Sequence, residues 1–230
     1  MVLVDTIRKR WLKILVHVGA LLPFVFLVRD YALNLFLVDP VREITTRTGR
    51  MALILLLLSL ACTPINTLFG FRRALRVRRA LGLYAFMYAG LHFLTFVGLD
   101  YGFDLEFLGP AIFDQRYVIV GFAAFLLLLT LALTSTRGWQ RRLGRTWKRL
   151  HKFAYLAGIL AVVHFLWLVK DPREPLRFAA VLLLLLALRI PRVRRATSYV
   201  RNRIKRATYP LRSHLGRIAK GQNRSHFSKT

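Results

Sequence analysis

Cysteine and acidic residues are scarce in this chain. Cys62 is the only cysteine among 230 residues, and 10 aspartates and glutamates stand against 37 lysines and arginines. A single cysteine excludes a disulfide scaffold and zinc sites built on several cysteines. The sequence has neither an internal repeat nor a glycine-rich phosphate loop, and its polar stretches are too short for a separate nucleotide-binding domain. Because 56% of the residues are apolar, the chain is also excluded from the disordered class.

Apolar and basic residues are segregated into blocks. Runs such as FAAVLLLLLAL alternate with runs such as FRRALRVRRA. No small-residue cleavage site ends the first apolar run, so we interpret it as a membrane span rather than a signal peptide. A bilayer core of about 30 Å takes about 20 helical residues. The pattern predicts an all-α polytopic membrane protein, a six-helix transmembrane bundle with spans at about 11–28, 49–69, 80–99, 117–134, 150–169 and 176–190.

Alternate loops differ sharply in charge, and this difference predicts the orientation. Four segments together hold 29 of the 37 basic residues and a single acidic residue, Asp5; they are 1–13, 72–79, 137–152 and 189–230. The positive-inside rule therefore predicts that both termini are cytoplasmic. The loops near 30–47, 100–114 and 170–174, which with their flanks hold the other nine acidic residues, are expected on the opposite side.

The C-terminal segment is strongly basic. From Arg189 onward it has 13 lysines and arginines and no acidic residue. Charge alone would suit nucleic acid. The segment lacks a recognisable nucleic-acid-binding fold or an aromatic stacking platform, so we expect anionic lipid headgroups as its partner and no nucleic acid. We divide the chain into a transmembrane domain, 1–195, and a basic cytoplasmic tail, 196–230.

Four of the six histidines fall in or at the predicted spans. They are His17, His92, His151 and His164, whereas His214 and His226 lie in the basic tail, where a solvated side chain is expected. Ionisable side chains inside a membrane are costly, and each is a candidate functional residue. For any one of them, a hydrogen bond between helices is the alternative interpretation.

His92 and His164 are expected at matching depths. His92 lies 13 residues after Arg79 and His164 lies 15 residues after Arg149, and each arginine ends a basic loop. The difference in depth is about 3 Å of helical rise, so the two side chains are expected to face each other, nearer the outer side. Small residues precede each histidine at the same steps: Gly82, Ala85 and Ala89 before His92, and Ala154, Ala157 and Ala161 before His164.

Small residues beneath a histidine suit either close helix packing or a flat slot between two helices. Two neutral imidazoles that face a planar gap suit axial ligation of a haem iron. A bare metal ion would need further ligands, and the spans contain no carboxylate. We therefore interpret His92 and His164 as axial haem ligands.

His151 and His17 are candidates of a different kind. His151 precedes His164 by 13 residues, which corresponds to about 20 Å of rise but turns the side chain about 140° away. His151 reaches the same gap only if the helix is bulged or starts irregularly, and Gly158 is a candidate position for the irregularity. Arg78 and Arg79, rather than a histidine, occupy the matching depth on the third span, so a second bis-histidine haem would need His17. Alternatively, His151 ligates a lower haem with a partner other than histidine, or hydrogen-bonds a propionate or a flavin, and the number of haems, one or two, stays open.

The predicted cytoplasmic ends of the third and fifth spans carry basic residues and aromatic rings. Haem propionates and flavin phosphates both favour such cations, although the positive-inside rule explains them equally well. Trp147 and Tyr155 flank His151 at four residues on either side, and they suit either a stacked flavin or quinone ring or an interfacial aromatic belt. The cations are Arg78, Arg79, Arg142, Arg145, Lys148 and Arg149.

Three stretches resemble a known family. LKILVHVGALLPFVFLV, RRALGLYAFMYAGLHFLTFVGLDYG and LALTSTRGWQRRLGRTWKRLHKFAYLAGILAVVHFLWLVK are similar to the MsrQ (YedZ) family, within the ferric-reductase-like transmembrane superfamily. The resemblance runs from Trp11 to about Arg195, and the block around His151 and His164 is its most specific part. The tail beyond Arg195 is longer than the family leads us to expect.

The resemblance implies an electron-transfer subunit of an oxidoreductase complex in the bacterial inner membrane. Such a subunit binds haem b through residues that fall here on His92, His151 and His164, and flavin mononucleotide (FMN) is attributed to the family. It takes electrons from the membrane quinone and passes them to a periplasmic molybdopterin-containing catalytic subunit, which reduces methionine sulfoxide in oxidised proteins. The chain itself would lack the methionine sulfoxide reductase active site. The resemblance assigns no flavin-binding residue.

Two alternatives differ in class. One is a ferric-reductase-like electron-transfer protein with another acceptor, although a self-contained ferric reductase usually has a fused flavin and nicotinamide domain for which this chain has no room. The other is a non-redox membrane scaffold in which the histidines only pack. A visible absorption spectrum separates the scaffold from the redox proteins, because only the latter bind haem.

The charge asymmetry makes a testable prediction about topology. A reporter enzyme that is active only in the periplasm, fused after Thr230, is expected to be inactive, because the rule places that end inside. The same reporter fused within the loop at 100–114 is expected to be active. Strong activity after Thr230 would contradict the assignment.

Overall fold

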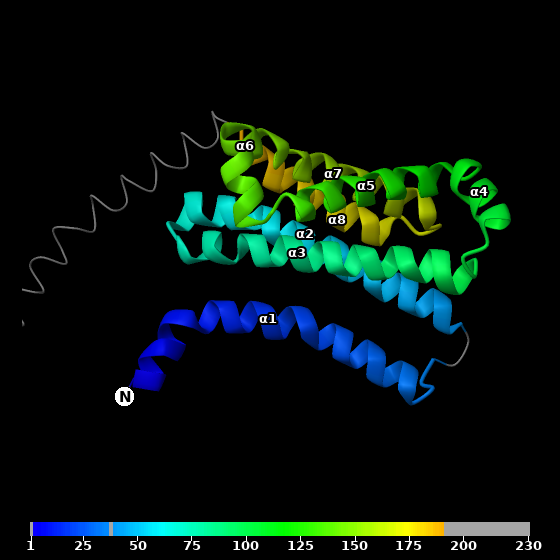
Figure 1. Ribbon diagram of the computed structural model, residues 1–230, viewed down its shortest axis with the longest axis horizontal. Coiled ribbons are helices and arrows are strands. Elements are labelled where there is room, and N and C mark those ends of the chain that lie inside the picture. The colour runs from blue at the N-terminus through cyan, green and yellow to red at the C-terminus, as the bar shows by residue number, and fades with distance from the viewer. Residues whose placement is uncertain (1, 37–38, 191–230) are drawn as a thin grey trace, which may run out of the picture.

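The structure is a computed structural model that describes residues 2–36 and 39–190. The predicted tail at 196–230 lies outside these residues. Every regular element in the described part is helical (Figure 1). The elements are α1 (Val2–Ala32), α2 (Pro40–Phe69), α3 (Arg73–Leu94), the π-helix η1 (Thr95–Asp100), α4 (Leu105–Phe113), α5 (Arg116–Leu133), α6 (Arg137–Leu150), α7 (Phe153–Leu168) and α8 (Arg173–Ala187).

The long helices lie side by side and the short ones lie at the two ends. In Figure 1, α2, α3, α5, α7 and α8 form a bundle, α1 runs along one side of it, and α4 and α6 lie at opposite ends. The most extensive packing joins α2 to α3 and α5 to α7. At the centre, Ala85 of α3 and Ala157 of α7 are fully buried in one hydrophobic cluster. The bundle is therefore organised as two helix pairs packed against each other.

Four helical segments are long and apolar enough to cross a membrane: Trp11–Ala32, Pro40–Phe69, Arg73–Asp100 and Arg116–Leu133. Helices α6 and α7 meet at a 52° bend and would make a fifth span if they cross together. Helix α8, with 15 residues, is about 22 Å long, less than the bilayer core of about 30 Å. The chain is thus a multi-pass membrane protein, while the sixth span and the cytoplasmic location of the termini stay predictions.

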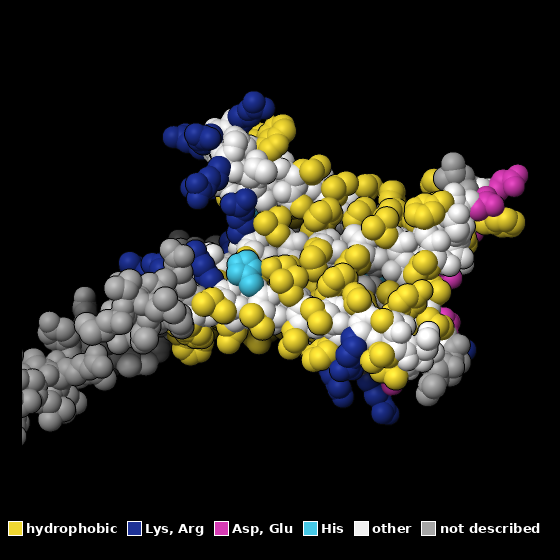
Figure 2. All heavy atoms as spheres, turned by 60° about the horizontal axis from the view of Figure 1, so that its bottom comes forward, with side chains coloured by type: hydrophobic (Ala, Val, Ile, Leu, Met, Phe, Trp, Pro, Cys, Tyr) yellow, Lys and Arg dark blue, Asp and Glu magenta, His cyan; other side chains and the backbone are white. Residues whose placement is uncertain are grey.

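The surface agrees with a membrane environment. Figure 2 shows hydrophobic side chains over the middle of the molecule, acidic side chains at one end and a group of lysines and arginines at the other. Exposed apolar residues such as Leu15 (59%) and Leu183 (66%) would be unfavourable in water but make favourable contacts with lipid tails.

Capping side chains fix the helix ends. The Asp39 carboxylate accepts a hydrogen bond from the Arg42 backbone N–H at 2.9 Å, and Pro40 occupies the first turn of α2, where a missing N–H costs nothing. Gly70 ends the same helix in the left-handed conformation, with φ of 71°. Asp104 caps α4 and Thr136 caps α6 in the same way as Asp39.

Helices α4 and α6 were not expected, because both lie in segments that the sequence predicts to be loops. Helix α6 is rich in arginines, and its apolar stripe is therefore easily overlooked in the sequence. The stripe has steps of four, four and three residues: Trp139, Leu143, Trp147 and Leu150. This stripe is the signal of an amphipathic helix lying along the surface. Gly144 interrupts it with φ of 48°, a conformation that suits glycine.

Ion pairs join the helices at the end of the bundle that carries the acidic side chains. Asp30 of α1 is 9% exposed. Its carboxylate forms salt bridges with the guanidinium groups of Arg29, at 2.6 Å, and of Arg47 on α2, at 2.7 Å. Arg50 of α2 pairs with Glu174 of α8 at 2.8 Å. Because these carboxylates are paired, they help to hold α1 and α8 against α2.

Candidate functional site

His92 and His164 lie against each other in the bundle. His92 is in the last turn of α3 and His164 is in α7. Their ring centroids are 6.1 Å apart and the ring planes are at 84°. The structure therefore brings together the two side chains that the sequence predicts to face each other, and haem ligation by them stays a prediction.

Backbone carbonyls fix the orientation of both rings. The Nδ1 atom of His92 lies 2.9 Å from the Thr45 carbonyl oxygen on α2, and that of His164 lies 2.7 Å from the Tyr117 carbonyl oxygen on α5. A carbonyl oxygen only accepts hydrogen bonds, so each Nδ1 carries the proton and donates it. Each Nε2 atom then keeps a free lone pair, which is the arrangement that metal-binding histidines show.

Two glycines provide the space that the imidazole rings of His92 and His164 occupy. A Cβ atom added at Gly49 would lie 2.9 Å from Nδ1 of His92, and one added at Gly121 would lie 2.6 Å from Nδ1 of His164. Both contacts are closer than any ordinary side chain allows, so each ring lies directly against a helix backbone.

The two halves of this site are equivalent. Thr45, Gly49 and His92 correspond to Tyr117, Gly121 and His164, each 72 residues later in the chain. Although the sequence analysis finds no internal repeat, these contacts recur at one spacing, so α2 with α3 and α5 with α7 hold their histidines in the same way. The repeat escapes sequence comparison because few positions besides small residues and histidine are constrained. A shared glycine 43 residues before each histidine was the available signal.

The residues of this site fit a haem. Metal–imidazole bonds are about 2.0 Å long and each ring nitrogen lies about 1 Å from its ring centroid, so two imidazoles on one metal have centroids about 6 Å apart. The observed 6.1 Å matches that separation. No group of three or more His, Cys, Asp or Glu side chains that would hold a bare ion occurs among the described residues. Two ligands suffice for haem because the porphyrin supplies the other four.

The stripes of small residues divide between two uses. Ala85 and Ala157 are fully buried in the packed core between the helices, which supports the close-packing interpretation there. Gly82 and Ala154, one turn further from the histidines, line a cavity instead. The small residues therefore do not form one continuous slot.

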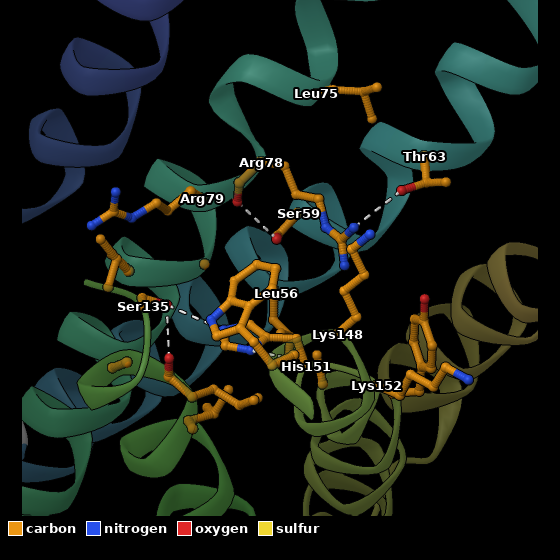
Figure 3. Close-up of a pocket in the computed structure, with 18 of the residues that line it drawn as sticks. Leu56, Ser59, Thr63, Leu75, Arg78, Arg79, Ser135, Lys148, His151 and Lys152 are labelled. Carbon is orange, nitrogen blue, oxygen red and sulfur yellow. Dashed lines mark hydrogen bonds between the residues drawn. The ribbon is translucent and has the colours of Figure 1, made fainter. Parts of the chain in front are cut away.

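That cavity has a volume of about 910 Å³ and opens at the end of the bundle where the basic loops gather. Ser59 donates a hydrogen bond to the Arg78 carbonyl at 3.0 Å, and the Arg78 guanidinium donates to Thr63 at 3.4 Å (Figure 3). Among the residues that the structure describes, no aspartate or glutamate lines the cavity, whereas five cations do: Arg78, Arg79, Lys148, Lys152 and Arg189. Its lining therefore has an uncompensated positive charge. Of the predicted collar, Arg142, Arg145 and Arg149 are not part of this lining.

His151 is a lining residue of the same cavity but differs from the other two histidines. It caps the end of α6, so the bend between α6 and α7 precedes α7. The helix does start irregularly, at the bend before Phe153, but not near Gly158. Gly158 lies within α7, where its missing side chain lets Leu60 and Leu182 pack closely. The His151 ring stacks on Trp147 at 4.0 Å, its Nδ1 lies 3.2 Å from the Trp147 carbonyl oxygen, and its Nε2 lies 3.4 Å from the Ser135 hydroxyl.

His17 joins neither site. Its Nδ1 atom is hydrogen-bonded to the Tyr84 hydroxyl of α3 at 2.8 Å. Tyr84 precedes His92 by eight residues, about 12 Å of helical rise. His17 is also absent from the lining of the cavity that contains His151. The structure therefore does not bring His17 to His151, as a second bis-histidine haem would require.

Comparison with known proteins agrees with this geometry. Residues 48–162 match the family described as ferric reductase like transmembrane component, a range that includes His92 and ends two residues before His164. Three relatives are each described as the protein-methionine-sulfoxide reductase heme-binding subunit MsrQ. The relative from Xanthomonas axonopodis pv. citri is 48% identical over 77% of this chain and 85% of its own length. That from Xanthomonas campestris pv. campestris (strain 8004) is 52% identical over 66% and 70%.

The third relative is from Rhodospirillum rubrum and is 45% identical over 83% of this chain and 93% of its own length. Identity of this extent, over most of both chains and together with the paired histidines, is sufficient to assign the family. The chain belongs to the MsrQ family of ferric-reductase-like membrane proteins.

Proposed function

We propose that this protein is the b-type cytochrome subunit of a methionine sulfoxide reductase system in the bacterial inner membrane. It would take electrons from the membrane quinone and deliver them to a periplasmic molybdopterin-containing catalytic subunit. The observation that carries the proposal is the His92–His164 pair, with both Nε2 atoms free and the ring centroids 6.1 Å apart. The relatives' description as heme-binding subunits supports it. When bound, haem supplies reversible one-electron chemistry within the membrane.

The chain's own residues keep the two imidazoles ready for ligation. The carbonyls of Thr45 and Tyr117 hold the protons on Nδ1 and prevent rotation of the rings. Gly49 and Gly121 allow the rings to approach the helices closely enough to make these hydrogen bonds. Preorganised ligands of this kind bind a metal without a further loss of side-chain entropy.

The inner cavity is proposed to bind FMN rather than a second haem. Its five cations suit a phosphate group, and Trp147 offers an aromatic face for a flat ring. A second bis-histidine haem is disfavoured because Arg79, 72 residues before His151, occupies the position that corresponds to it in the repeat. Both nitrogen atoms of His151 also lie near polar atoms of the protein.

The outer loop that follows His92 is proposed as the docking surface for the catalytic subunit. Between Thr95 and Asp114 the chain has four acidic residues, no basic residue, and no ion pair within the described structure. Phe103, Phe107 and Phe113 are 64%, 67% and 74% exposed beside these acids. Apolar anchors with a charged rim suit recognition by a protein with a basic surface.

This loop is also unusual in its backbone. It begins with the π-helix η1, a form that is frequent at functional sites, and both Gly102 and Phe103 have positive φ, of 57° and 60°. A bulky residue such as Phe103 rarely adopts this conformation. The loop therefore has a specific shape only a few residues beyond the haem ligand His92, as electron delivery at this face requires.

Haem ligation is tested by substitution of the histidines and of a glycine. His92→Ala and His164→Ala are each expected to abolish the low-spin haem spectrum of the purified protein, because each removes an axial ligand. Gly121→Ala is expected to lower haem content at least severalfold, because the added methyl group overlaps the His164 ring. Gly90→Ala is the matched control, since a Cβ there meets no atom within 4 Å. Full haem with an unchanged spectrum in both histidine variants would contradict the pairing.

The flavin assignment is tested by neutralising the cavity. The double variant Arg78→Gln, Lys148→Gln is expected to reduce the FMN that copurifies with the protein by about tenfold, because two charge-assisted contacts to phosphate are lost. Haem content is expected to stay unchanged. Arg142→Gln serves as the control because Arg142 does not line the cavity. If the double variant keeps wild-type FMN, the flavin binds elsewhere.

Docking is tested by reversing charge in the outer loop. The variant combines Asp100→Lys and Glu106→Lys with Asp104→Asn, which preserves the cap of α4. Re-oxidation of the reduced haem by the purified periplasmic partner is expected to slow about tenfold at low ionic strength and to lose its dependence on salt, because the attraction is electrostatic. An unchanged rate with an unchanged salt dependence would show that the partner docks on another surface.

A further inference from the structure

His17 is the exception to the usual placement of ionisable residues in a membrane. Such side chains almost always face the interior of the bundle. His17 is exposed on α1, and it is the only one of the described histidines that is. Around it on the same helix, Val18, Leu21 and Val25 are 56%, 41% and 57% exposed.

His17 and Tyr84 form a hydrogen-bonded pair at this surface. Nδ1 of His17 lies 2.8 Å from the Tyr84 hydroxyl, and the ring centroids are 5.6 Å apart at an angle of 72°. No atom of the described residues makes a hydrogen bond to the Nε2 atom of His17. This nitrogen is therefore available to a ligand that approaches from the lipid.

The pair can adapt to a donor or to an acceptor. When the Tyr84 hydroxyl donates to Nδ1, the proton of the imidazole is on Nε2, which donates to a ligand carbonyl. When Nδ1 carries the proton and donates to the Tyr84 oxygen, Nε2 accepts from a ligand hydroxyl. The same two residues thus bind the carbonyl of a quinone and the hydroxyl of the corresponding quinol.

Packing of α1 alone does not require this pair. One turn further along both helices, the buried hydroxyl of Tyr88 donates to the Ala20 carbonyl at 2.7 Å, and both residues are 1% exposed. That contact already fixes α1 to α3 in a dry environment. The His17–Tyr84 pair lies beside it at the exposed edge, where a polar group gains most from a ligand.

The depth and charge of the pair select the ligand class. His17 follows Trp11, where the apolar run begins, by six residues, which corresponds to about 9 Å of helical rise. A phospholipid phosphate favours lysines and arginines at the interface, whereas the pair contains neither and lies deeper. Tyr84, Tyr88 and His92 also follow each other at steps of four on α3, so the pair begins a stripe that ends at the haem ligand.

We propose that His17 and Tyr84 bind the headgroup of a lipid-soluble quinone or quinol that enters from the bilayer between α1 and α3. The Nε2 atom of His17 makes the hydrogen bond to the ligand, and Tyr84 sets the tautomer. In the proposed function, a quinol is the electron donor, and this site is where it would bind. The role of the site therefore rests on the proposed function, whereas binding of the quinone does not depend on haem.

Binding is measured directly with the full-length protein in lipid nanodiscs. The probe is a short-chain azido-benzoquinone, titrated and photolysed, with labelled peptides identified by mass spectrometry. Labelling of the 11–28 and 80–92 peptides is expected. His17→Leu and Tyr84→Phe are each expected to weaken half-maximal labelling at least about fivefold, as the loss of one hydrogen bond predicts. Tyr88→Phe, which removes the buried contact between the same helices, is expected to stay within about twofold of wild type.

Each outcome bears on the site. Wild-type labelling in both His17→Leu and Tyr84→Phe would overturn the proposal, and so would an equal loss in Tyr88→Phe, because helix packing would then explain all three. Labelling that falls in nanodiscs rich in phosphatidylglycerol, compared with neutral lipid, would identify a phospholipid site instead. The haem spectrum is recorded in parallel: a wild-type protein without haem would contradict the proposed function while labelling still decides the quinone site.

Discussion

Two hydrogen bonds from imidazole to backbone carbonyl determine most of what this bundle can do. The Nδ1 atoms of His92 and His164 donate to Thr45 and Tyr117, at 2.9 and 2.7 Å, so both Nε2 atoms are left for a metal. For these bonds to form, α2 and α5 must approach the rings closely, which requires Gly49 and Gly121. The approach in turn sets the packing of α2 on α3 and of α5 on α7, the two most extensive contacts in the fold. The contacts that orient the histidines are therefore also contacts that pack the helices, and they recur 72 residues later in the chain.

Charge divides the molecule along the direction of the helices. At one end, arginines and lysines surround a cavity that no carboxylate of the described residues lines, which suits an anionic group. At the other end, Asp30 and Glu174 are paired with arginines, while the acidic residues between Thr95 and Asp114 are not. The histidine pair lies toward this second end, because His92 immediately precedes the π-helix that leads into the acidic loop. An electron taken up at the inner side and released at the outer side is consistent with this polarity.

The sequence was sufficient to predict the helical class, the long spans and the meeting of His92 with His164, since apolar length and depth along a helix follow from residue counts alone. It was not sufficient for the carbonyl partners or the two glycines, because a close approach between helices depends on their rotation and crossing. Helix α6 was hidden by its arginines, although the spacing of Trp139, Leu143 and Trp147 indicated it. The bend before Phe153 also moved His151 off α7, which no periodicity in the sequence marks. For His17, residue counts predict the depth in the membrane but not the direction of the side chain, and only the structure reveals its contact with Tyr84.

The central claim is that His92 and His164 share one haem and that no second bis-histidine site exists in the described bundle. The most direct measurement is the haem content per chain of the purified wild-type protein, determined together with the visible spectra of its oxidised and reduced forms. We predict one haem per chain, with the low-spin spectrum of two imidazole ligands in both oxidation states. A protein that binds no haem, binds two, or binds one in a high-spin form would contradict the account.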